Sequence, residues 1–204
     1  MLRPPRVSDV RAREALRSSN ESWLRPWDPS LPGGAPEPHS PLEPLVALAR
    51  KSPARPYIVD VHRELLARRG IAFGWLICYG TQLAGELNLR QISWGSVRSA
   101  ELGYWVDQKL AGRGIMPTAL AMCVDHCFGV LGLHRLEAGI RPDNVPSRRA
   151  VEKLGFHDEG IRRRQVHIDG EWRDHICYAV TAEDVPGGML PRWRTALTAS
   201  RSGN

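Results

Sequence analysis

Two glycines in a short turn, Gly112 and Gly114, carry the clearest chemical signal in the sequence. Residues 101–106 before them are typical of a strand, and the residues after them repeat apolar side chains at helical spacing. The start of a helix leaves backbone N–H groups unpaired and its dipole favours negative charge, so glycines there let a phosphate approach the main chain. Many strand–helix turns carry glycine for steric reasons alone, so the turn by itself leaves both interpretations open.

A second group of polar residues lies at the end of another expected strand, residues 136–141, in which apolar and polar side chains alternate. Taken together, the segments resemble the GNAT superfamily of acyl-CoA-dependent N-acyltransferases, and within it the RimJ/RimL-type group that acetylates protein N-termini. The likeness runs from about residue 2 to residue 185. It rests on Gly103-Tyr104-Trp105-Val106, Gly112-Arg113-Gly114, Arg141-Pro142-x-Asn144-x-x-Ser147, Lys153-Leu154-Gly155-Phe156 and Gly170-x-Trp172-Arg173-Asp174-His175.

The resemblance implies a mixed α/β fold with a mostly antiparallel central sheet, helices on both faces, and fourth and fifth strands that splay apart. Acetyl-CoA, as co-substrate, enters this gap, and its pantetheine arm pairs with the backbone of Trp105 and Val106. Main-chain N–H groups of the turn hold its pyrophosphate, namely those of Gly112, Arg113, Gly114, Ile115 and Met116. The chain departs from the family pattern at Ala111, usually Gln or Arg, and at Met116, usually a small residue. Because the pyrophosphate is bound by main-chain N–H groups, these two side-chain differences should have little effect on its binding. No metal is expected.

The same resemblance suggests two catalytic residues. Glu101, at the start of the strand beside the thioester, acts as a base through water; a solvated glutamate at a strand end is the alternative. Ser147 protonates the departing thiolate, or it only caps helix N–H groups. Asn144 binds the pantetheine amide and can cap the same helix.

Three residues are weaker candidates on the acceptor side of the site. Trp27 belongs to a loop, residues 22–29, that borders the acceptor cleft in this group, and is as compatible with a core lid. Asp174 and His175 lie on a hairpin, where a structural pairing of Asp174 with Arg173 or a neighbouring arginine is an alternative role. An obvious catalytic histidine is not required, because an α-amine with a pKa near 7.8 is roughly 14% neutral at pH 7, against about 0.04% for a lysine near 10.4.

The sequence is compatible with three functions. The first is acetyl transfer to the N-terminal α-amine of a protein, in particular the alanine of a ribosomal protein, with ribosome association as a further possibility. The second is acetylation of a small amine such as an aminoglycoside or polyamine, for which Glu86, Glu101 and Asp174 would form an acidic cleft. The third is a CoA-binding module without catalysis, to which Ala111 and Met116 lend slight support.

The 204 residues fit one domain, expected over residues 1–185, followed by a loosely ordered basic tail over residues 186–204. The net charge of +6 suits an anionic partner such as CoA, an acidic protein or ribosomal RNA. The arginine clusters lack interleaved aromatic residues, so no dedicated nucleic-acid role is expected.

No apolar run approaches the roughly 20 residues that a membrane span needs. The first residues lack the apolar core of a signal peptide, so we expect a cytoplasmic protein. Its oligomeric state, monomer or homodimer, stays open.

Periodicity predicts helices over residues 10–22 and 57–69, strands over 71–78 and 83–92, and a hairpin that joins 159–168 to 171–180 through Asp169-Gly170. Thr181 and Asp184 have the spacing of a capping pair for a short helical turn.

Cys123 and Cys127 lie one turn apart on an apolar helix face, so buried thiols are expected and a disulfide framework or zinc site is not. Met1 directly precedes a segment that the family normally places after a full strand, so the first strand is trimmed or the natural start lies upstream.

Overall fold

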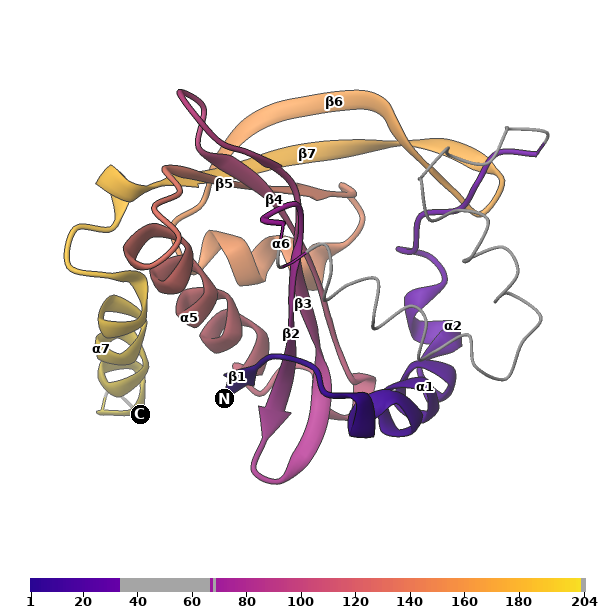
Figure 1. The fold of residues 1–204 in the computed structure, drawn as a ribbon, viewed down its shortest axis with the longest axis horizontal. Helices are drawn as coiled ribbons and strands as arrows, with labels where there is room; N and C mark the ends of the chain where they lie inside the picture. Colours follow the sequence, from indigo (N-terminus) through magenta and orange to yellow (C-terminus); the bar gives the residue numbers. More distant parts are fainter. Residues whose placement is uncertain (34–66, 68, 203–204) are drawn as a thin grey trace.

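The computed structural model describes residues 1–33, 67 and 69–202, and its centre is a seven-stranded sheet (Figure 1). The strands have the spatial order β1-β2-β3-β4-β5-β7-β6, and all neighbours are antiparallel except β4 and β5. Their bounds are β1 (Leu2–Arg3), β2 (Phe73–Tyr79), β3 (Gln82–Ser93), β4 (Ser99–Val106), β5 (Arg135–Ile140), β6 (His157–Ile168) and β7 (Glu171–Thr181). This mixed α/β architecture confirms the predicted fold class.

The parallel strands β4 and β5 separate soon after they meet. They pair only from Ser99 with Arg135 to Glu101 with Glu137, whereas β4 stays paired with β3 as far as Val106. Beyond Glu101, β4 therefore diverges from β5 and leaves the side of its backbone that faces β5 without a strand partner. The predicted splay of the fourth and fifth strands is confirmed.

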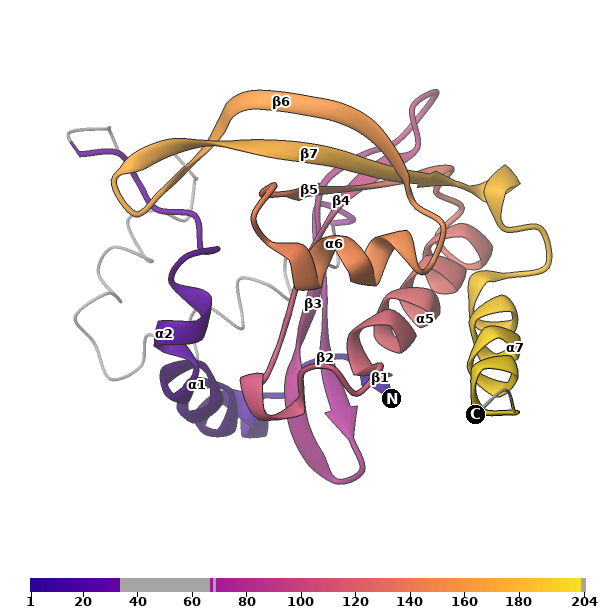
Figure 2. The ribbon, with the colours of Figure 1, turned by 180° about the vertical axis from the view of Figure 1, so that it is seen from behind.

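Helices cover both faces of the sheet, as predicted (Figures 1 and 2). On one side lie α1 (Val10–Ser19) and α2 (Glu21–Leu24), which replace the single predicted helix over residues 10–22. On the other side lies α5 (Ile115–Gly129), with α6 (Val145–Glu152) and α7 (Met189–Ser202) near it. The helix predicted over residues 57–69 falls almost entirely outside the described residues. In the described part of the chain, no helix combines the length and apolar character needed to cross a membrane.

The helix α5 forms the centre of the core because nearly its whole circumference is covered. Leu120 and Val124 are completely buried, and the buried thiols of Cys123 and Cys127 lie 3.7 Å apart. The expectation of buried thiols is thus confirmed for both residues. A rigid α5 matters for the site, because the start of this helix carries the glycine turn.

The prediction of a loosely ordered tail is wrong for residues 189–202, which form α7. Met189 is completely buried against the core and Trp193 is 8% exposed. The carboxylate of Asp125 on α5 accepts hydrogen bonds from the backbone N–H groups of Met189, at 2.6 Å, and Leu190, at 3.0 Å. The cap of α7 is thus supplied by a residue 64 positions away in the sequence. The apolar residues of α7 are interspersed with polar and basic residues, so the sequence does not show an obvious apolar face. The predicted Thr181–Asp184 capping pair is present before it.

Candidate active site

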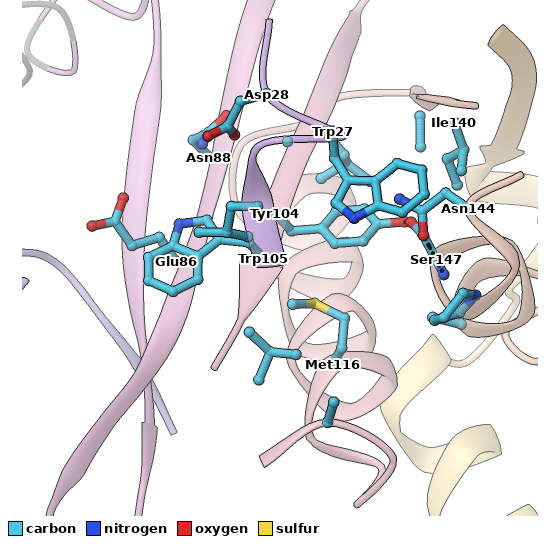
Figure 3. Close-up of a pocket in the computed structure, with 18 of the residues that line it drawn as sticks. Trp27, Asp28, Glu86, Asn88, Tyr104, Trp105, Met116, Ile140, Asn144 and Ser147 are labelled. Carbon is cyan, nitrogen blue, oxygen red and sulfur yellow. Dashed lines mark hydrogen bonds between the residues drawn. The ribbon is translucent and has the colours of Figure 1, made fainter. Parts of the chain in front are cut away.

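A cleft of about 1450 Å³ occupies the space between the diverging strands. Its walls come from α1, the segment after α2, β3, β4, the glycine turn, α5, β5, α6, both strands of the β6–β7 hairpin and α7. Nearly all the residues predicted for the site line it: Trp27, Glu101, Trp105, Val106, Gly112, Arg113, Gly114, Ile115, Met116, Asn144, Ser147 and His175. Figure 3 shows five of them, Trp27, Trp105, Met116, Asn144 and Ser147. The fold therefore brings together segments that are far apart in the sequence.

The glycine turn has the conformation that anion binding requires. Gly112 has φ +79° and Gly114 has φ +74°, in the left-handed region that residues with a Cβ rarely adopt. Gly114 is the N-cap of α5, and no described heavy atom lies within 4 Å of the place where a Cβ would stand on either glycine. The backbone is thus open to the cleft, and the side chains of Arg113, Arg149 and Lys153 add positive charge to its walls. This cradle fits a diphosphate group.

Ser147 and Tyr104 meet in the middle of the cleft. The Ser147 Oγ lies 2.8 Å from the Tyr104 hydroxyl oxygen, so one hydroxyl donates to the other (Figure 3). Burial raises the pKa of Tyr104, which keeps the phenol protonated at neutral pH. Asn144 accepts a hydrogen bond from the Ser147 N–H at 3.2 Å and so caps α6, as predicted. The sequence indicated Tyr104 only as part of the Gly103–Val106 motif, which assigns it no catalytic role.

Glu101 lies at the other end of the splay, in a group arranged around Gly139 of β5. A Cβ on Gly139 would be 3.6 Å from the Glu101 Oε1, 3.6 Å from the Gln165 Oε1 and 3.8 Å from the Cβ of His175. The Gln165 Oε1 is buried and has no hydrogen-bond partner among the described residues. Three polar side chains from β4, β6 and β7 therefore surround the space that Gly139 leaves open. Gln165 was missed by sequence reasoning because its strand was recognised only as half of a hairpin.

His175 is buried in this group, and burial lowers its pKa, so the imidazole is neutral at pH 7. Its Nδ1 lies 3.1 Å from the backbone carbonyl of Arg173. A carbonyl only accepts, so this contact assigns the proton to Nδ1 and leaves the lone pair on Nε2.

Asp174 is not among the described residues that line the cleft. It is exposed, and its Oδ1 accepts a hydrogen bond from the backbone N–H of Arg164 at 2.7 Å. Successive side chains of a strand point to opposite faces, so the strand that buries His175 turns Asp174 outwards. Of the alternative pairings, Arg173 pairs with Glu171 instead, at 2.9 Å, and the arginine that contacts Asp174 is Arg164, through its backbone N–H.

Arginines pair with two of the four acidic residues that line the described part of the cleft. Arg13 pairs with Glu86 at 2.8 Å, and Arg17 pairs with Asp28. Arg17 also lies over the Trp105 ring, with 5.3 Å between the guanidinium carbon and the ring centroid. This end of the cleft is thus not the acidic surface expected for a small cationic substrate.

Trp27 forms part of the wall and is held by Arg141. The guanidinium carbon of Arg141 is 5.3 Å from the centroid of the Trp27 ring, and its Nη1 donates to the carbonyl oxygen of Pro26 at 2.8 Å. Arg141 comes directly after β5, so the segment after α2 is attached to the strand that bounds the gap.

Comparison with known proteins decides the family. The family model of the Acetyltransferase (GNAT) domain matches residues 1–157, about three quarters of the chain. The chain belongs to the GNAT acetyltransferase family. The predicted resemblance is thereby confirmed, and the protein is an N-acetyltransferase.

Three GNAT relatives illustrate the likeness. The structure of Mycobacterium smegmatis RimJ in complex with CoA-disulfide superposes with a TM-score of 0.83 and 34% identity, over 96% of this chain and 88% of that chain. The ribosomal protein uS5-alanine N-acetyltransferase of Escherichia coli is 30% identical over 184 residues, 87% of this chain and 88% of the relative. The "Probable N-acetyltransferase YjcK" of Bacillus subtilis is 43% identical over 130 residues, 64% of this chain and 72% of the relative.

Proposed function

We propose that the protein transfers the acetyl group of acetyl-CoA to the N-terminal α-amine of a ribosomal protein, with alanine as the terminal residue. The observation that carries the proposal is the cleft, in which an open glycine cradle, the Ser147–Tyr104 hydroxyl pair and Glu101 share one continuous space. The choice of acceptor is supported by the E. coli relative, which is named for the alanine of protein uS5.

The divergence of β4 and β5 accounts for how CoA would lie. Trp105 and Val106 are paired with β3 on one side and lie beyond the last β4–β5 pair on the other, so their backbone can pair with the pantetheine amides. The pyrophosphate then reaches the N–H groups of residues 112–116 at the start of α5. When bound, acetyl-CoA supplies the thioester carbonyl that the amine attacks.

The residues of the chain would divide the proton steps between them. As the amine nitrogen bonds to the acetyl carbon, Glu101 takes its proton through a water molecule. As the carbon–sulfur bond breaks, Ser147 gives its hydroxyl proton to the thiolate, and the Tyr104 phenol donates to the Ser147 oxygen. A proton from solvent, passed through the Tyr104 hydroxyl, then restores the Ser147 hydroxyl. The high pKa of Tyr104 suits this role, because the phenol must remain protonated to donate.

The charge of the cleft favours a peptide over a polyamine or aminoglycoside. Of the described residues that line it, seven are arginine or lysine and four are aspartate or glutamate. Among the three acidic residues first considered, Glu86 is paired with Arg13 and Asp174 lies outside, so only Glu101 remains. A small polycation would meet repulsion here, whereas a peptide brings one α-amine and a neutral backbone.

The decisive experiment is mass spectrometry of a peptide library incubated with acetyl-CoA and the protein. We expect a single acetyl group on the α-amine, with peptides that begin with alanine converted fastest. The matched control is a peptide with an acetylated N-terminus and one internal lysine, which should be inert. Turnover of that blocked peptide would contradict the α-amine assignment and favour lysine as acceptor.

Ser147→Ala should lower kcat by about ten- to a hundred-fold, within the range of a general acid, and leave the Kd for acetyl-CoA nearly unchanged. The reason is that a proton donor matters only when the thiolate forms. Tyr104→Phe, which keeps the ring and removes the hydroxyl, should give a smaller loss of kcat. Steady-state kinetics and calorimetry measure the two quantities. A loss of acetyl-CoA affinity equal to the loss of kcat would mean that Ser147 is a binding residue.

A further inference from the structure

The helix α7 is attached to the glycine turn through two hydrogen bonds in series. The indole N–H of Trp193 donates to the Thr118 Oγ1 at 2.9 Å, and the Thr118 hydroxyl donates to the backbone carbonyl of Gly114 at 2.8 Å. Gly114 is the N-cap of α5 and the centre of the proposed phosphate cradle. The position of α7 is thus linked to the backbone that would hold the pyrophosphate.

The same helix is attached to the end of α6. Arg192 donates to the backbone carbonyl of Leu154 and, at 3.2 Å, to that of Asp184. Gly155 has φ +85°, and a Cβ there would collide with the Arg192 guanidinium. A glycine is therefore needed at position 155 for this close approach as well as for its backbone conformation. Through Trp193 and Arg192, α7 bridges the start of α5 and the end of α6.

The bridge also contributes surface to the cleft. Trp193 and Leu197 line it, together with the cationic side chains of Arg113, Arg149 and Lys153. The small exposed part of Trp193 and the Leu197 side chain place apolar surface beside several positive charges. A phosphorylated nucleoside requires this combination, because the base needs an apolar contact and the phosphates need cations. At about 1450 Å³, the cleft exceeds the 300–1,000 Å³ typical of a site for one drug-sized ligand, which leaves room for a nucleotide beyond the pantetheine arm.

We propose that α7 forms part of the binding site for the nucleotide half of CoA, with Trp193 as the residue that both contacts it and fixes the glycine turn. The proposal rests on the proposed use of acetyl-CoA and adds a determinant of affinity outside residues 1–157, the part matched by the family model. A substitution confined to Trp193 would weaken the nucleotide contact and leave the acyl-transfer residues in place.

Calorimetric titration of the full chain with CoA, and separately with pantetheine, tests the proposal. Trp193→Phe keeps an aromatic ring but removes the N–H, and should weaken CoA binding about five-fold; Trp193→Ala should weaken it more than ten-fold. Neither change should alter the affinity for pantetheine, which lacks the nucleotide. Trp172→Phe, at an exposed tryptophan of β7, is the matched control and should leave both affinities unchanged.

A double-mutant cycle with Thr118→Val separates the hydrogen-bond chain from simple contact. If Trp193 acts through Thr118, Trp193→Phe should have little further effect on CoA binding once Thr118 is valine. CoA affinities of Trp193→Phe and Trp193→Ala equal to that of the parent would overturn the proposal, as would an equal loss for pantetheine. Failure of the parent protein to bind CoA would instead contradict the proposed function itself, so the two failures are distinguishable.

Discussion

Replacing Gly114 by aspartate is expected to weaken acetyl-CoA binding by at least about a hundred-fold. The residue has φ +74° and an open space where a Cβ would stand, so the new carboxylate would occupy the place proposed for the pyrophosphate. Two like charges about 4 Å apart repel by about 4 kcal/mol near a protein surface, and each 1.4 kcal/mol corresponds to a factor of ten in affinity. Isothermal titration calorimetry measures the change.

Gly114→Asn is the matched control, because asparagine has nearly the same size, tolerates the left-handed region and carries no charge. It should bind acetyl-CoA more tightly than Gly114→Asp, and the difference isolates electrostatic repulsion from bulk. Parental affinity in Gly114→Asp would place the phosphate elsewhere. Circular dichroism of both variants excludes a trivial loss of α5.

Glu101→Gln is expected to lower kcat/KM on an N-terminal peptide by about ten- to a hundred-fold at pH 7. The loss should shrink at pH 9, because an α-amine with a pKa near 7.8 is then about 94% neutral and has less need of a base. Initial rates at the two pH values, with acetyl-CoA saturating, provide the comparison.

Glu183→Gln supplies the control for the loss of one negative charge, since Glu183 pairs with His134 on the surface and outside the cleft. It should leave the rates unchanged at both pH values. An equal response of Glu101→Gln at pH 7 and pH 9 would show that Glu101 positions the substrate rather than accepting its proton. An absence of any response would direct attention to His175, whose neutral imidazole lies in the same group around Gly139.

The parts of the site that depend on neighbours in the sequence could be predicted. The glycine turn, the Asn144 cap and the Asp169-Gly170 hairpin each need only a few adjacent residues, whose conformational preferences are strong. The splayed strands and the CoA cleft followed from the order of the family's motifs rather than from the physics of any single motif.

The parts of the site that depend on contacts between distant residues could not be predicted from the sequence. Tyr104 and Ser147 are 43 positions apart, and nothing local to either residue indicates that their hydroxyls meet. Asp174 and His175 were both expected at the acceptor end, yet adjacent residues of a strand must face opposite sides. The helix α7 was missed because its cap, Asp125, lies on another helix and its apolar face is set among basic residues.

The short pairing between β4 and β5 also has a consequence for the empty protein. Unpaired backbone groups along a strand are a template for pairing with another chain, and native proteins normally confine such edges to the margins of a sheet and protect them. Here an edge of this kind lies inside the sheet, beyond Glu101, and the pantetheine arm would complete its ladder. Ligand occupancy would then shield these backbone groups from pairing with another chain, in addition to its part in the proposed reaction.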